Sequence, residues 1–224
     1  HADNTDLMVQ INGIVNEYIH VEKPDQEAVP SRQFDISKID FELLSREFAH
    51  TRRKNLLLRD LDELVNQQLS KMLFANPQRI DYYDRYQEII DAYNAEQNRA
   101  TIEKTFMDLM ELASSLDTEQ QRYVREGFSS DEELSVYDLL FSENLTKQEI
   151  ETIKKVSVDL LTKIKQQIAK LDHWTDKQET KAIVDNLIRN TLWQELPNSY
   201  DVSDIQTYQK KIYEYVYMRY PEVA

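Results

Sequence analysis

Cysteine is absent from the 224 residues, while glycine occurs only twice, at Gly13 and Gly127, and proline five times. Without cysteine the chain has no disulfides and no thiolate ligands for a metal. Scarce glycine and proline leave little material for the tight turns of a sheet, or for a loop whose backbone cradles phosphate. We therefore expect an all-α protein, an irregular bundle of about eight to ten helices with no sheet and no nucleotide-binding loop.

Positive charge is also scarce, since 41 acidic side chains outnumber 27 basic ones and the formal net charge is −14. DNA carries about one negative charge per ~1.7 Å of duplex, so it repels such a chain unless the cations cluster. Short basic runs occur at 52–54, 154–155 and 210–211. The candidate nucleic-acid contacts are Arg52, Arg53 and Lys54. The alternative interpretation of this run is a solvated helix face.

Long hydrophobic runs are missing as well. No apolar stretch approaches the roughly 18–20 residues that cross a bilayer. We expect a cytoplasmic protein that does not enter a membrane. Because the chain opens on His1 and not on methionine, we also expect it to be a fragment of a longer protein.

Apolar residues recur at helical spacing, which predicts helices that each bury one stripe. Two such patterns meet within 76–106. The first contains Tyr82, Tyr86, Ile89, Ile90 and Tyr93, and the second contains Ile102, Phe106, Leu109, Met110 and Ala113. Further long helices are predicted over 37–50, 53–75 and 147–171, before Pro197 and before Pro221, with short ones between 117 and 141.

Pro24 and Pro30 place a domain boundary near the start of the chain. We predict an N-terminal helix and linker over 1–36 and a single helical assembly domain over 37–224. Capping residues refine the helix ends. Predicted N-terminal caps are Ser37, Asp117, Ser129 or Ser130, Thr146 (with Glu149 in a capping box) and Thr175. Gly127 is predicted to follow a helix as its C′ residue.

Residue patterns that carry chemistry are weak. Glu179-Thr180-Lys181 has the lettering of a nuclease E-x-K, but a helix sends the two charged side chains about 200° apart. Glu132 and Glu133 fit the start of a helix, where acids favour the dipole. The histidines at 1, 20, 50 and 173 lack the spacing of a helical zinc pair. We expect no catalytic, cofactor-binding or metal-binding residue here, although a Ser/His pair assembled by folding stays open.

Five blocks of sequence resemble the C-terminal helical region of the restriction (R) subunit of type I restriction-modification enzymes, particularly its IC-like group. The first three are KNLLLRDLDELVNQQLSKML (54–73), NPQRIDYYDRYQEIIDAYN (76–94) and IEKTFMDLMELASSLDTEQQRYVREGFSSDEELSVYDLL (102–140). IETIKKVSVDLLTKI (150–164) and HWTDKQETKAIVDNLIRNTLWQELPNSY (173–200) follow in the same order. The resemblance covers about 50–205 well and the first fifty residues more loosely.

The resemblance implies a large subunit, an ATP-dependent type I site-specific deoxyribonuclease with an upstream nuclease domain and two RecA-like motor domains. ATP and Mg²⁺ are then implied for the full-length subunit, and no cofactor for this fragment. Residues 1–36 would leave the motor region, and the helical domain would dock onto the modification and specificity subunits. Double-stranded DNA would be bound through the full-length subunit. No nuclease or helicase motif falls within these residues, so no catalytic residue is carried over.

Two other functions stay open on the sequence alone. One is a free-standing acidic helical adaptor for an unrelated protein partner. The other is a hydrolase whose site is assembled only by folding. Neighbouring methyltransferase and specificity genes would favour the restriction-enzyme reading over the adaptor.

Overall fold

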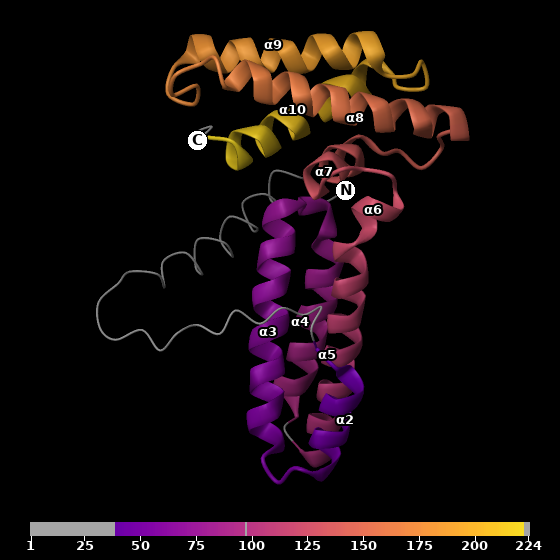
Figure 1. Cartoon of the computed structure of the whole chain (residues 1–224), viewed down its shortest axis with the longest axis vertical. Helices are drawn as coiled ribbons and strands as arrows, with labels where there is room; N and C mark the ends of the chain where they lie inside the picture. The colour runs from indigo at the N-terminus through magenta and orange to yellow at the C-terminus, as the bar shows by residue number, and fades with distance from the viewer. Residues whose placement is uncertain (1–38, 97, 222–224) are drawn as a thin grey trace. The chain divides into compact units, whose positions relative to one another are not determined.

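The computed structural model describes residues 39–96 and 98–221, and these contain nine α-helices (α2 to α10), one 3-10 turn (η2) and no strand (Figure 1). The prediction of an all-α bundle is confirmed. The predicted segment 1–36 and the predicted cap Ser37 lie outside the described residues. The chain divides into two compact units, the first ending at Arg122 and the second beginning at Tyr123. The sequence predicts a single domain over 37–224, because the spacing of apolar residues does not indicate this division.

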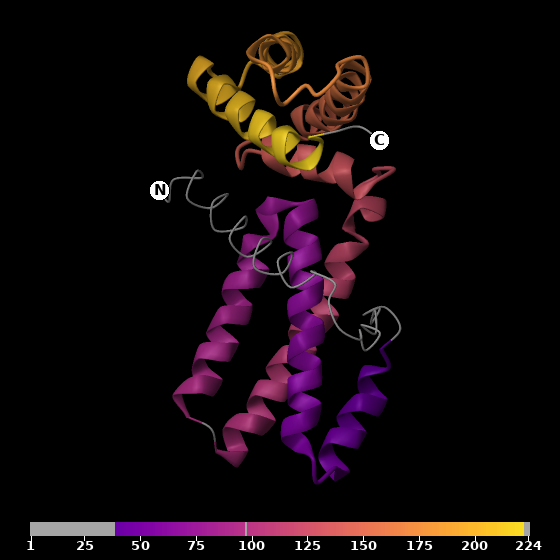
Figure 2. The same ribbon diagram turned by 90° about the vertical axis from the view of Figure 1, so that its left-hand side faces the viewer.

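Unit 1 contains α2 (Phe41–His50), α3 (Lys54–Ala75), η2 (Pro77–Arg79), α4 (Ile80–Ala95) and α5 (Arg99–Gln120). The three long helices α3, α4 and α5 lie side by side, and each runs opposite to the one before it (Figures 1 and 2). α3 ends before Pro77, which lacks the N–H needed to continue a helix. Asn76 stabilises the turn because its side-chain oxygen accepts the Gln78 N–H at 3.1 Å.

The apolar stripes of these helices meet in one core. Phe48 of α2 stacks on Phe106 of α5 with 3.6 Å between ring centroids, which joins α2 to α5. Along α4, Tyr86 and Ile89 are buried, whereas Tyr82, Ile90 and Tyr93 are partly buried at the edge of the core. The buried set on α3 and α5 is Leu58, Leu61, Leu64, Val65, Leu69, Met72, Leu73, Phe106, Leu109, Met110, Leu112, Ala113 and Leu116.

One predicted helix start in unit 1 differs from the structure. Asp117 does not cap a new helix, because α5 continues to Gln120 with Leu116 and Glu119 both buried on its inner face. The N-cap of α2 is Asp40, whose carboxylate accepts the Leu43 N–H at 3.0 Å. Burial of Leu116 and Glu119 therefore overrides the local capping signal at Asp117.

A buried ion-pair group joins η2 to the end of α5. Arg79 Nε and Arg122 Nε lie 3.0 and 2.9 Å from the same oxygen, Glu119 Oε1. Arg79 and Glu119 are buried, whereas Arg122 is partly exposed. The carboxylate thus has two cationic donors, which offsets the cost of removing it from water.

Asp62 on α3 accepts a hydrogen bond of 2.8 Å from the Tyr86 hydroxyl on α4. Burial raises the pKa of the Asp62 carboxyl, although the bond from Tyr86 opposes the rise. A raised folded-state pKa means that the ionised carboxylate costs stability at neutral pH. That cost disappears as the pH falls through the folded-state pKa.

Asp62→Asn is therefore expected to stabilise unit 1 at pH 7, because the amide oxygen still accepts from Tyr86 without a charge to bury. The half-exposed site limits the gain to the order of 0.5 kcal/mol. Urea titrations followed by far-UV circular dichroism check this at pH 7 and at about pH 3, where both forms are uncharged and the difference should vanish. A larger difference at the acidic pH would contradict the prediction.

Unit 2 contains α7 (Asp131–Leu140), α8 (Lys147–Ile168), α9 (Gln178–Glu195) and α10 (Val202–Arg219), and the single turn α6 (Arg122–Arg125) leads into it. Gly127 has φ of +85° and follows α6 as predicted. The Phe128 N–H donates to the Tyr123 carbonyl and the Gly127 N–H to the Val124 carbonyl. These two bonds form the Schellman motif that ends a helix.

Caps in unit 2 confirm two predictions and contradict one. Ser130 caps α7, and Thr146 with Glu149 forms the predicted capping box of α8. Thr175 does not cap α9, which begins three residues later at Gln178. The preceding turn is held instead by buried Trp174, whose carbonyl accepts from the Thr180 hydroxyl at 2.7 Å.

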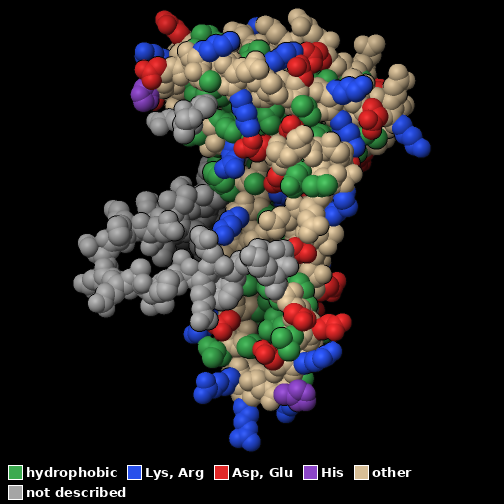
Figure 3. Space-filling model, in the orientation of Figure 1, with side chains coloured by type: hydrophobic (Ala, Val, Ile, Leu, Met, Phe, Trp, Pro, Cys, Tyr) green, Lys and Arg blue, Asp and Glu red, His purple; other side chains and the backbone are tan. Residues whose placement is uncertain are grey.

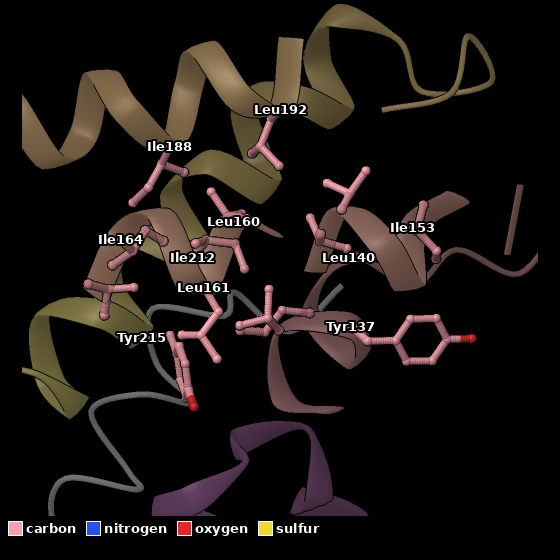
Figure 4. Close-up of a cluster of buried hydrophobic side chains, with 14 of the residues drawn as sticks. Tyr137, Leu140, Ile153, Leu160, Leu161, Ile164, Ile188, Leu192, Ile212 and Tyr215 are labelled. Carbon is pink, nitrogen blue, oxygen red and sulfur yellow. The ribbon is translucent and has the colours of Figure 1, made fainter. Parts of the chain in front are cut away.

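The core of unit 2 lies between four helices (Figure 4). α8 packs against α7 and α9, and α10 also packs against α7 and α9. Leu160, Ile188 and Ile212 are fully buried on three different helices. Ile150 in the first turn of α8 and Leu171, which follows the end of α8, are only partly buried. All four helices contribute buried side chains to this core, and those labelled in Figure 4 are Tyr137, Leu140, Ile153, Leu160, Leu161, Ile164, Ile188, Leu192, Ile212 and Tyr215.

Candidate functional site

The predicted basic run lies at one end of unit 1, where a short loop joins α2 to α3. Residues 48–59 include no aspartate or glutamate. Arg52 and Arg53 are exposed, while Lys54 is the first residue of α3 and is half-buried. Figure 3 shows lysine and arginine side chains gathered at this end of the unit. The first turn of α3 also lacks an acidic residue, so no side chain there opposes the positive end of its dipole.

Lys54 differs from its two neighbours because it has a structural role. Its Nζ lies 2.7 Å from Glu103 Oε1 on α5 and 4.8 Å from the centre of the Phe48 ring. Arg99 Nε lies 3.3 Å from the same carboxylate oxygen. The hydrogen bond from Lys54, and then that from Arg99, hold the pKa of Glu103 below its ordinary value. Lys54 thus ties the start of α3 to the start of α5.

A surface depression of about 620 Å³ opens at this end. It is lined by Thr51, Arg52, Arg53, Lys54, Asn55, Leu56, Arg99 and Ile102. The structure thus brings the three predicted residues together in one place and adds Arg99. Sequence reasoning missed Arg99 because it lies 45 residues from Lys54, and only the pairing of α3 with α5 makes them neighbours.

In each of the other two basic runs one lysine makes contacts within unit 2, whereas Lys155 and Lys210 are exposed. Lys154 Nζ lies 3.0 Å from the carbonyl and from a carboxylate oxygen of Glu126. Lys211 is half-buried, which lowers the pKa of its amine, and its Nζ lies 5.4 Å from the centre of the Tyr208 ring. Cations that are occupied in this way contribute little to an external ligand.

The acidic and basic residues that the sequence suggested for catalysis lie at helix starts or form ion pairs between helices. Glu179 and Lys181 lie in the first turn of α9, as the helical period predicts. Glu132 of α7 forms ion pairs with Lys165 of α8 and Arg219 of α10. Within the described ranges, no three histidine, aspartate or glutamate side chains form a group that could hold a metal.

Unit 2 exposes two large apolar side chains on one face of α9. Ile183 and Trp193 are 43% and 47% exposed, and they lie about 15 Å apart along the helix. Asn186 and Asn190 fall between them on the same side, opposite the buried Ile188. We call Ile183, Asn186, Asn190 and Trp193 the α9 face. Its two apolar ends resemble the anchors of a protein interface.

Over residues 39–96 and 98–221, no helix combines the length and hydrophobicity needed to cross a membrane. Comparisons with curated proteins and with solved structures give no match. Residues 2–220 match the family model described as "Type I restriction enzyme HindI endonuclease subunit-like, C-terminal". The predicted IC-like grouping is finer than this match and stays a prediction. Because the match spans nearly the whole chain, the protein belongs to the family of C-terminal regions of HindI-like type I restriction endonuclease subunits.

Proposed function

We propose that this chain is the assembly region of an R subunit, which docks the motor onto the modification and specificity subunits and performs no catalysis itself. The observation that carries the proposal is the match of residues 2–220 to the C-terminal part of an endonuclease subunit. ATP and Mg²⁺ would then act in the rest of the full-length subunit. The chain alone is expected to show neither ATPase nor nuclease activity.

The α9 face supports a docking role. Trp174, the other tryptophan of the chain, is buried in the core, whereas Trp193 leaves much of its ring in water. Exposed tryptophans are over-represented among the residues that dominate interface energy. Asn186 and Asn190 supply hydrogen-bonding groups between the two apolar ends, and a typical interface includes several direct hydrogen bonds.

The test is a pull-down of the 224-residue chain with tagged modification and specificity subunits. Wild type is expected to be retained, and Ile183→Ala/Trp193→Ala to bind at least about tenfold more weakly. Leu43→Ala/Met107→Ala is the matched control, because these side chains are also exposed and apolar but belong to unit 1.

A folded wild-type chain that fails to bind would overturn the docking role. Equal binding by wild type and the α9 variant would overturn only the choice of surface. The adaptor alternative predicts failure with these subunits together with a gene neighbourhood that contains no methyltransferase or specificity gene.

A further inference from the structure

We propose that the basic depression of unit 1 binds the sugar–phosphate backbone of a DNA duplex without reading its sequence. The choice of DNA as the ligand rests on the proposed function, because an R subunit acts on a duplex. The site itself rests on the side chains that line the depression. It lies in unit 1, whereas the α9 face that we propose for docking belongs to unit 2.

Arg52 and Arg53 are the groups that would contact phosphate. Both are exposed, and the described residues place no carboxylate within ion-pair distance of either. A guanidinium presents paired N–H donors that fit two phosphate oxygens at once and is weakly hydrated for a cation. Two adjacent arginines on a loop can therefore reach the backbone at little cost in desolvation.

The wall of the depression is also positively charged. Lys54 and Arg99 share the single carboxylate of Glu103, so two cations face one anion there. Glu103 holds both side chains in place. Leu56 and Ile102 supply apolar lining between these charges, and this lining suits the carbon atoms of deoxyribose.

The negative net charge of the chain disfavours DNA binding outside the basic depression of unit 1. With a net charge of −14, most of the surface repels a polyanion. The segment 48–59 is an exception because it has no acidic residue. At about 0.1 M salt, charges more than ~10 Å apart are largely screened, so the local cluster decides whether phosphate binds.

Fluorescence anisotropy of a labelled duplex of about 30 base pairs tests the proposal, with salt varied from about 50 to 200 mM. For three or four phosphate contacts, log K should fall with log salt with a slope of about −3 to −4. Arg52→Glu/Arg53→Glu is expected to weaken binding more than tenfold at the lowest salt and to reduce the slope by about two. Glutamate near the start of α3 favours its dipole, so the variant should fold.

The matched control is Lys170→Glu/Lys177→Glu, which makes the same change in net charge at exposed residues of unit 2. It should bind DNA nearly as wild type does. No wild-type binding, or equal losses in both double variants, would overturn the proposal. So would displacement of the duplex by inorganic phosphate or by poly-glutamate at matched ionic strength, which would assign the depression to a small anion or an acidic protein.

The same variants separate this proposal from the docking role. Arg52→Glu/Arg53→Glu should still be retained by the modification and specificity subunits. Ile183→Ala/Trp193→Ala should still bind the duplex. DNA binding without docking, or docking without DNA binding, identifies which of the two proposals has failed.

Discussion

Leu160→Asp is expected to unfold unit 2 at room temperature. Leu160 lies at the centre of α8, is fully buried and faces the core formed with the other helices of the unit (Figure 4). The substitution removes roughly 1.5–3 kcal/mol of apolar burial and places a carboxylate where it costs several kcal/mol more. Together these match or exceed about 5 kcal/mol, the lower end of the stability of small domains.

Tryptophan fluorescence is the appropriate measurement, because both tryptophans of the chain lie in unit 2. Loss of burial around Trp174 should move the emission toward that of a solvated indole. Thr162→Asp is the matched control: Thr162 is exposed on the same helix, so the cost should stay below about 1 kcal/mol. Native emission and an unchanged unfolding midpoint for Leu160→Asp would show that this core assignment is wrong.

Glu119→Leu is expected to destabilise unit 1 by about 3–5 kcal/mol. The change removes the carboxylate that buried Arg79 contacts at 3.0 Å and that Arg122 contacts at 2.9 Å. The effect arises mainly from loss of the carboxylate that balances the buried guanidinium, since leucine itself suits a buried position. Urea unfolding followed by far-UV circular dichroism measures the loss.

A double variant identifies the cause. Arg79→Met/Glu119→Leu removes both buried charges and should recover most of the stability lost in Glu119→Leu alone. If the double variant is instead less stable than wild type by the sum of the losses measured in the two single variants, the two side chains do not depend on one another. That result would contradict the assignment of a coupled buried pair.

Helix content and the caps with strong local signals follow from the sequence. Thr146 and Glu149 satisfy each other's backbone donors within four residues, so the capping box of α8 depends on no distant contact. Gly127 is similar, because a left-handed backbone is inexpensive only for glycine. Thr175 and Asp117 show where local signals fail. With Trp174 buried, α9 begins later in the chain than Thr175 predicts, at Gln178. With Leu116 and Glu119 buried, α5 continues past Asp117 to Gln120.

The sequence by itself therefore determined the all-helical class, the buried stripes and the family resemblance. The spacing of apolar residues and the order of residues in the matching blocks are both local properties of the chain. Only the tertiary structure divided the chain at 122/123, paired Arg79 with Glu119 and set Arg99 beside Arg52 and Arg53. The tertiary structure also showed that Lys54 is held by Glu103, whereas its neighbours Arg52 and Arg53 are exposed. These features arise from contacts between helices far apart in the chain, and packing selects such contacts from many that a helical pattern allows.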